Sequence, residues 1–163
     1  MDRMTRLLVA ALGAAALVPP SPGEAQLLEV RQTVFGMDCA PCAYAVERRM
    51  SRLDGAVEVQ LSLNEGFARV RFDDAHGTTL EEIRREVRDN GFGAREARIQ
   101  VRGSIVREGS VVVLRTPIGD TYRIRGEGPL PRPDPGTESE VTGRISGDRD
   151  EAGRWFLDLD REG

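Results

Sequence analysis

Two hydrophobic periodicities alternate between residues 26 and 97, and this alternation restricts the fold more than any other feature of the chain. Apolar residues recur every third or fourth position from Cys42 to Leu53 and from Leu80 to Val87, which predicts two amphipathic helices. Apolar and polar residues alternate in four other segments, which predicts strands at residues 27–34, 57–63, 67–72 and 94–97. The predicted order is therefore strand, helix, strand, strand, helix, strand.

Local start and stop signals support these elements. Asp54-Gly55 is expected to end the first helix, and Asn64-Glu65-Gly66 should turn between two paired strands. Thr79-Leu80-Glu81-Glu82 has the pattern of a capping box, and Asn90-Gly91 should stop the helix that follows it. With right-handed crossovers, this order predicts an α+β fold, a ferredoxin-like βαββαβ sandwich with an antiparallel sheet and both helices on one face.

The chain after residue 97 lacks helical spacing. Short apolar runs alternate with glycines, which predicts about five short strands and a small OB-like all-β barrel over residues 98–163. Three prolines place residues 130–136 in a loop, because proline cannot sit in a central strand. Tyr122, Trp155 and Phe156 are expected in the barrel core, and they are too few to predict a platform for nucleic-acid bases. The role of this second domain stays open.

The first 25 residues have the features of a secretory signal peptide. Arg3 and Arg6 precede an apolar run from Leu7 to Val18, and small residues at positions 23 and 25 predict cleavage after Ala25. The run is shorter than the roughly 20 residues that span a bilayer. The expected organisation is thus a signal peptide at 1–25 and domains at 26–97 and 98–163, in a periplasmic protein that does not span the membrane after cleavage.

Charge and cysteine content exclude several classes of function. The formal net charge is -4, so no basic excess favours nucleic acid or anionic lipid. The 163 residues include only two cysteines, too few for a disulfide framework. We find no acid–base pair, nucleophile signature or phosphate-binding loop, and we expect no enzyme.

The two cysteines lie in Gly36-Met37-Asp38-Cys39-Ala40-Pro41-Cys42. Cys39 is expected in the loop before the first helix and Cys42 at the helix start, where the helix dipole favours thiolates. Two thiolates separated by two residues can face one soft ion such as Cu(I) or Hg(II). Met37 is expected to anchor the loop by packing inward.

This motif, within the βαββαβ pattern from Leu27 to Ala97, resembles the heavy-metal-associated domain family of copper chaperones, metal-pumping ATPase domains and periplasmic mercury-binding proteins. The resemblance implies that Cys39 and Cys42 are the metal ligands and that Phe92 packs near them. In some zinc-, cadmium- and lead-exporting ATPases of this family, an aspartate before the first cysteine is a third ligand, and Asp38 occupies that position.

The sequence therefore favours a carrier of Hg(II) or Cu(I) that exchanges its ion with partner thiols or a membrane metal transporter. Three alternatives remain beside this function. Asp38 is a third ligand for Zn(II), Cd(II) or Pb(II), a solvated loop acid or, as we favour, a helix cap. The cysteine pair also fits a thiol–disulfide redox protein, and it can form a disulfide when no metal is bound. In a third view, the barrel docks to a transporter while the metal site acts as a sensor.

His76 is expected in a surface loop rather than at a metal.

Overall fold

The computed structural model describes residues 26–74, 76–126 and 138–160, which form two helices and eight strands. The elements in chain order are β1 (Leu27–Phe35), α1 (Ala40–Met50), β2 (Ala56–Ser62), β3 (Phe67–Phe72), α2 (Leu80–Asp89), β4 (Gly93–Glu108), β5 (Val111–Arg115), β6 (Thr121–Arg125), β7 (Glu138–Arg149) and β8 (Trp155–Leu159). The predicted signal peptide and the predicted loop at 130–136 lie outside the described residues. Neither described helix is long and apolar enough to cross a membrane.

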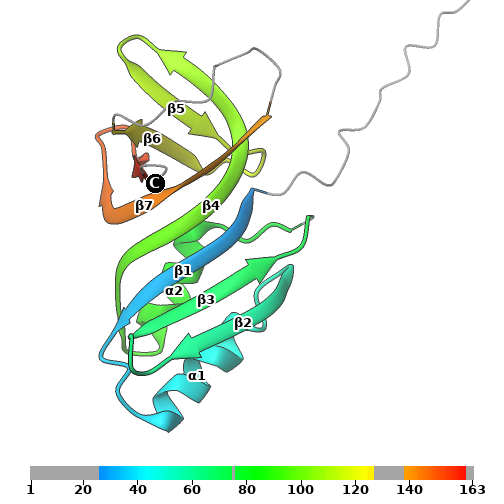
Figure 1. The fold of residues 1–163 in the computed structure, drawn as a ribbon, viewed down its shortest axis with the longest axis vertical. Coiled ribbons are helices and arrows are strands. Elements are labelled where there is room, and N and C mark those ends of the chain that lie inside the picture. Colours follow the sequence, from blue (N-terminus) through cyan, green and yellow to red (C-terminus); the bar gives the residue numbers. More distant parts are fainter. Residues whose placement is uncertain (1–25, 75, 127–137, 161–163) are drawn as a thin grey trace, which may run out of the picture.

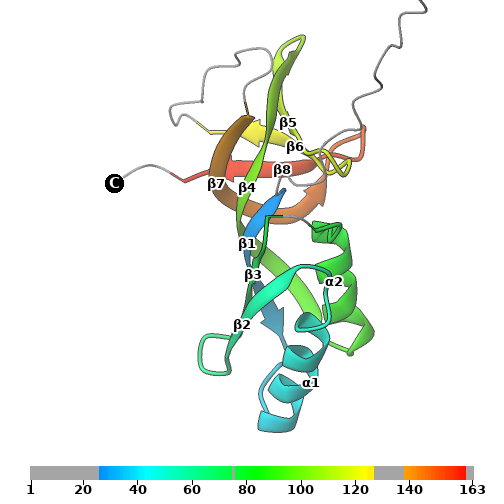
Figure 2. The ribbon, with the colours of Figure 1, turned by 90° about the vertical axis from the view of Figure 1, so that its right-hand side faces the viewer.

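The first six elements form the predicted ferredoxin-like unit. Strands β2, β3, β1 and β4 lie in that order and pair antiparallel. Figure 2 shows both helices on one side of these strands, and Figure 1 looks at the opposite, helix-free face. Apolar residues of alternate strand positions and of the inner helix faces share one core, including Val30, Val34, Val46, Met50, Ile83 and Val87.

Two details of the first helix and the second strand differ from the prediction. The helix α1 ends at Met50 rather than near Asp54, because the next residues form a tighter turn in which Leu53 donates its N–H to the carbonyl of Met50. Leu53 still reaches the core. The alternation of apolar residues over 57–63 predicts that Val57 shares a buried face with Val59 and Leu61, but the register of β2 is irregular between Ala56 and Glu58 and Val57 is exposed.

The strand β4 continues through the predicted domain boundary at residues 97 and 98. Its first part pairs with β1, and its last part pairs with β5, while β7 pairs along residues 97–104. The remaining pairs are β5–β6, β6–β8 and β8–β7, and only β6–β8 is parallel. The strands β5 to β8, which we call the C-terminal strands, therefore extend the ferredoxin-like unit through the shared strand β4.

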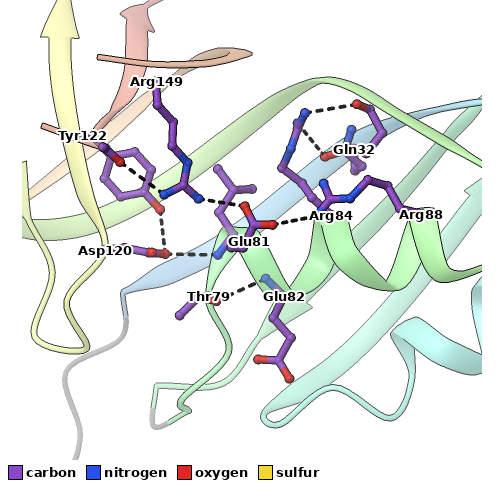
Figure 3. Close-up of polar contacts among 12 residues, drawn as sticks. Gln32, Thr79, Glu81, Glu82, Arg84, Arg88, Asp120, Tyr122 and Arg149 are labelled. Carbon is purple, nitrogen blue, oxygen red and sulfur yellow. Dashed lines mark hydrogen bonds and ion pairs between the residues drawn. The ribbon is translucent and has the colours of Figure 1, made fainter. Parts of the chain in front are cut away.

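Polar contacts also join the C-terminal strands to the start of α2 (Figure 3). The backbone N–H of Leu80 donates to Oδ2 of Asp120 at 3.0 Å, and Arg149 of β7 pairs with Glu81 at 2.7 Å. Burial raises the pKa of Glu81, but hydrogen bonds from Arg88 and Arg149 and their charges bring that pKa below its ordinary value. The N-terminal end of α2 is thus held against the C-terminal strands.

Candidate metal centre

The cysteine loop, residues 36–39, connects β1 to α1, and buried residues fix the part of it that follows β1. Val34, at the end of β1, donates its N–H to the carbonyl of Gly66, and Met37 is buried as predicted. Gly36 has a φ of 87°, a conformation that favours glycine. A side chain there would meet the ring of Phe92 at 3.9 Å, so Phe92 lies beside this loop.

Cys39 is the N-cap of α1, and Cys42 is its third residue. The Sγ atom of Cys39 accepts a hydrogen bond from the backbone N–H of Cys42 at 3.2 Å. The carbonyl of Cys39 accepts from the N–H of Ala43 at 3.0 Å. Both cysteines are half-buried, and their sulfur atoms are joined in a disulfide. Backbone N–H groups at a helix start stabilise negative charge, so this position suits a thiolate once the disulfide is reduced.

The structure corrects the predicted capping role of Asp38. The cap of α1 is Cys39, because its sulfur atom occupies the position from which a side chain accepts the free N–H of the first turn. Asp38 is exposed in the loop, in agreement with the alternative of a solvated acid. Among the described residues, no group of three or more His, Cys, Asp or Glu side chains is arranged to hold a metal ion.

The prediction that His76 lies in a surface loop is wrong. His76 is buried, with its ring stacked on Phe72 at a centroid distance of 4.5 Å. Its Nε2 lies 2.8 Å from the carbonyl of Leu27, and its Nδ1 accepts from the N–H of Thr78. His76 therefore links the segment before α2 to the sheet, which is a structural role.

Two exposed aromatic residues near the cysteines were not predicted. Phe35 at the end of β1 is 63% exposed, and Tyr44 in α1 is 64% exposed. The guanidinium of Arg95 lies 4.8 Å from the ring centre of Phe35. The sequence does carry a signal for Phe35, because it follows Val34 directly and so falls on the opposite side of the strand from the core residues.

The cysteine loop lies at the end of the molecule away from the C-terminal strands (Figures 1 and 2). The start of α2 contacts Asp120, whereas Phe92, just after the end of α2, lies beside the cysteine loop. The ten residues of α2 between them span about 15 Å. The described C-terminal strands therefore do not cover the cysteine pair.

Comparison with known proteins agrees with this site. The family model "Heavy-metal-associated domain" matches residues 32–93, which include the whole cysteine loop. Over 85 residues, the chain is 33% identical to the mercuric transport protein periplasmic component of Salmonella typhi, and it covers 90% of that protein with 52% of its own length. It is also 33% identical over 81 residues to copper-transporting ATPase 2 of Homo sapiens, of which it covers only 6% with 45% of its own length.

Among solved structures, the CopZ metallochaperone is 26% identical, with a TM-score of 0.38 over 40% of this chain and 97% of the chaperone. The mercuric relatives, which match over most of their own length, are named as periplasmic components of mercuric transport. The identity to a relative covered over 90% of its length, with the matched family model, establishes the relationship. The chain belongs to the heavy-metal-associated domain family.

Proposed function

We propose that this protein carries one soft metal ion, Hg(II) or Cu(I), between thiol sites outside the cytoplasm. The observation that supports this most is the placement of Cys39 and Cys42 on the uncovered N-terminal turn of α1 within a heavy-metal-associated domain. The ion is cargo that the protein takes up and releases, either as a metallochaperone or as a scavenger.

Two thiolates favour ions of low coordination number. Cu(I) and Hg(II) are soft and accept two sulfur ligands, whereas Zn(II) usually takes four ligands in a tetrahedron. Binding requires two electrons and two protons to open the Cys39–Cys42 disulfide, after which the ion displaces the two thiol protons. Metal loading therefore depends on prior reduction.

Transfer to a partner requires that a second pair of thiolates reach the bound ion. The cysteines are half-buried rather than enclosed, and the described C-terminal strands lie at the other end of α2. A partner thiolate can then join the ion before Cys39 or Cys42 leaves it. The partner we propose is a membrane metal transporter or another thiol-containing metal carrier, in line with the transport role named for the mercuric relatives.

We also propose where the protein is located and how its domains are organised. Residues 1–25 are proposed to direct export to the periplasm and to be removed after Ala25, and the periplasmic name of the mercuric relatives supports that location. The C-terminal strands are proposed to form a small OB-like barrel after the domain at 26–97. The cyclic pairing β4–β5–β6–β8–β7–β4, with its parallel β6–β8 pair, supports this arrangement.

The test is a metal titration of the reduced protein under anaerobic conditions. Cu(I), Hg(II) and Zn(II) are added in competition with a chelator, and native mass spectrometry counts the bound ions. We expect one soft ion per chain. Cys39→Ser should weaken its binding more than about 100-fold, because even residues that only support a metal ligand cost 10–100-fold when changed. The oxidised protein is the matched control and should bind none.

A thiol–disulfide redox function is the second candidate, and the Cys39–Cys42 disulfide is the observation that favours it. The same preparation distinguishes the two functions. Catalytic reduction of insulin without stoichiometric binding of a soft ion would reject the carrier function. Stoichiometric binding without insulin reduction would reject the redox function.

A further inference from the structure

Four arginines lie side by side across four neighbouring strands. Arg69 of β3 is opposite Arg31 of β1, Arg31 is opposite Arg98 of β4, and Arg98 is opposite Arg144 of β7. We call these four residues the arginine row. Directly opposite residues of an antiparallel pair share a face, with Cβ atoms about 4.5–5.5 Å apart. Val30, the neighbour of Arg31 in β1, is buried in the core that the helices share, so Arg31 and the rest of the row lie on the opposite face of the sheet.

Like charges directly opposite one another destabilise a sheet, so the row requires compensation. Arg31 pairs with Glu65 at 2.6 Å, and Asp160 lies 2.9 Å from Arg98 and 4.0 Å from Arg144. Arg31 and Arg98 therefore have close carboxylate partners, whereas the partner of Arg144 lies at the limit of an ion pair.

Arg69 and Arg144 have only long ion pairs, and Arg69 is the one of the four with a buried donor that lacks a partner among the described residues. Its nearest carboxylate, Glu58, lies 3.7 Å away and makes a closer contact of 2.9 Å with Arg71. The Nε atom of Arg69 is buried and has no hydrogen-bond partner among the described residues. A buried donor without a partner costs about 1–3 kcal/mol.

A cavity of about 360 Å³ lies against the same part of the sheet, lined by Arg31, Arg69, Arg98, Phe67, Gln100 and Thr142. Among the described residues, Glu29 is the only carboxylate in this lining, against three guanidinium groups. The guanidinium of Arg31 is stacked 3.8 Å from the ring centre of Phe67, which fixes its orientation. A second cavity of about 250 Å³ shares Arg31 and Arg98 and adds Arg144, together with the carboxylates of Glu96 and Asp160.

We propose that the arginine row binds the oxyanion group, phosphate or carboxylate, of a small molecule. Guanidinium groups present paired N–H donors that match both oxyanions, and the cavity has the volume of a small-ligand site rather than of a groove for a polymer. An oxyanion beside the Arg69 guanidinium would reduce the repulsion along the row. The site lies on the sheet face opposite the helices, so it does not depend on the proposed metal function.

The test is a titration of the reduced protein with inorganic phosphate and, separately, with citrate, at constant ionic strength, followed by backbone amide NMR. We expect saturable shifts confined to β1, β3, β4 and β7. Arg69→Gln should weaken binding about tenfold or more, because it removes a charged hydrogen bond. Arg98→Gln should also weaken it. The matched control is Arg107→Gln, an exposed arginine of β4 with no ion pair among the described residues, and it should change affinity less than about twofold.

Thermal unfolding of Arg69→Gln verifies that the variant folds, and we expect its stability to equal or exceed that of the wild type because one like charge is removed. Cys39→Ser should leave anion binding unchanged, which separates this site from the metal site. The proposal is overturned if neither anion saturates, or if Arg107→Gln weakens binding as much as Arg69→Gln. Saturation by a polyglutamate peptide alone would also overturn it and would indicate an acidic protein partner.

Discussion

The backbone N–H of Leu80, at the start of α2, donates a hydrogen bond to Oδ2 of Asp120, a residue 40 positions later in the loop between β5 and β6. The same oxygen accepts from the buried hydroxyl of Tyr122 at 3.1 Å (Figure 3). Thr79 already caps α2 by accepting from the N–H of Glu82. Asp120 therefore supplies a second acceptor to the helix start from the C-terminal strands.

Asp120→Ala should lower the free energy of unfolding by about 1–2 kcal/mol, because it leaves the N–H of Leu80 and the hydroxyl of Tyr122 without this acceptor. Chemical denaturation measures the change. Hydrogen exchange at Leu80 should accelerate more than exchange in the middle of α2. Asp148→Ala, which removes an exposed aspartate of β7, is the control and should change stability by less than about 0.5 kcal/mol. Unaltered exchange at Leu80 would contradict the second cap.

The Asp120 carboxyl also predicts a pH dependence of stability. Burial raises its pKa above the ordinary value, even though hydrogen bonds from Leu80 and Tyr122 act in the opposite direction. The folded state therefore binds this proton more tightly than the unfolded state does. Its contribution to stability is complete below the unfolded pKa of 3.8 and is lost as the pH rises through the folded pKa.

Asp120→Asn keeps an acceptor oxygen and removes the titration. The stability of this variant relative to the wild type should therefore increase as the pH rises from about 4, and it should level off above the folded pKa. Denaturation of both proteins at a series of pH values measures the difference, in which the titration of other groups largely cancels. If the difference in stability between the two proteins were independent of pH, the pKa of Asp120 would not be raised in the folded state.

The local part of the fold could be predicted because its signals are local. Helical spacing placed both helices, and the motif placed Cys42 at the start of α1 with Met37 buried. The features that were missed depend on distant partners. His76 is buried because Leu27 and Phe72 lie beside it in the folded sheet, and nothing in its own segment indicates this. The cap at Cys39 was assigned to Asp38 because aspartate is a common capping residue and cysteine is not.

Close contact between backbones in the C-terminal strands gives a further prediction. A Cβ atom at Gly143 of β7 would lie 2.5 Å from the carbonyl oxygen of Asp158 in β8. Gly143→Ala must therefore shift the paired strand and should lower stability by about 1–3 kcal/mol. At Gly77 the nearest atom to an added Cβ is 3.5 Å away, an ordinary contact, so Gly77→Ala is the control and should change the melting temperature little. Equal melting temperatures for the two variants would contradict the close packing of β7 on β8.

The last prediction decides whether Asp38 contributes to metal binding. Asp38 is exposed, and the cap that would have fixed its side chain is made by Cys39 instead. To act as a ligand, its carboxylate would have to be ordered by the ion itself, and a hard oxygen gains little from a soft ion. Asp38→Ala should therefore change the affinity of the reduced protein for Hg(II) or Cu(I) by less than about threefold. Competition with a chelator measures this affinity, and Cys39→Ser provides the reference for loss of a true ligand.

The same titration with Zn(II) and Cd(II) tests the alternative cargo, since a third ligand matters most for ions that prefer higher coordination. A large loss of Zn(II) or Cd(II) affinity in Asp38→Ala, with Hg(II) and Cu(I) affinity unchanged, would show that Asp38 is a third ligand for Zn(II) or Cd(II).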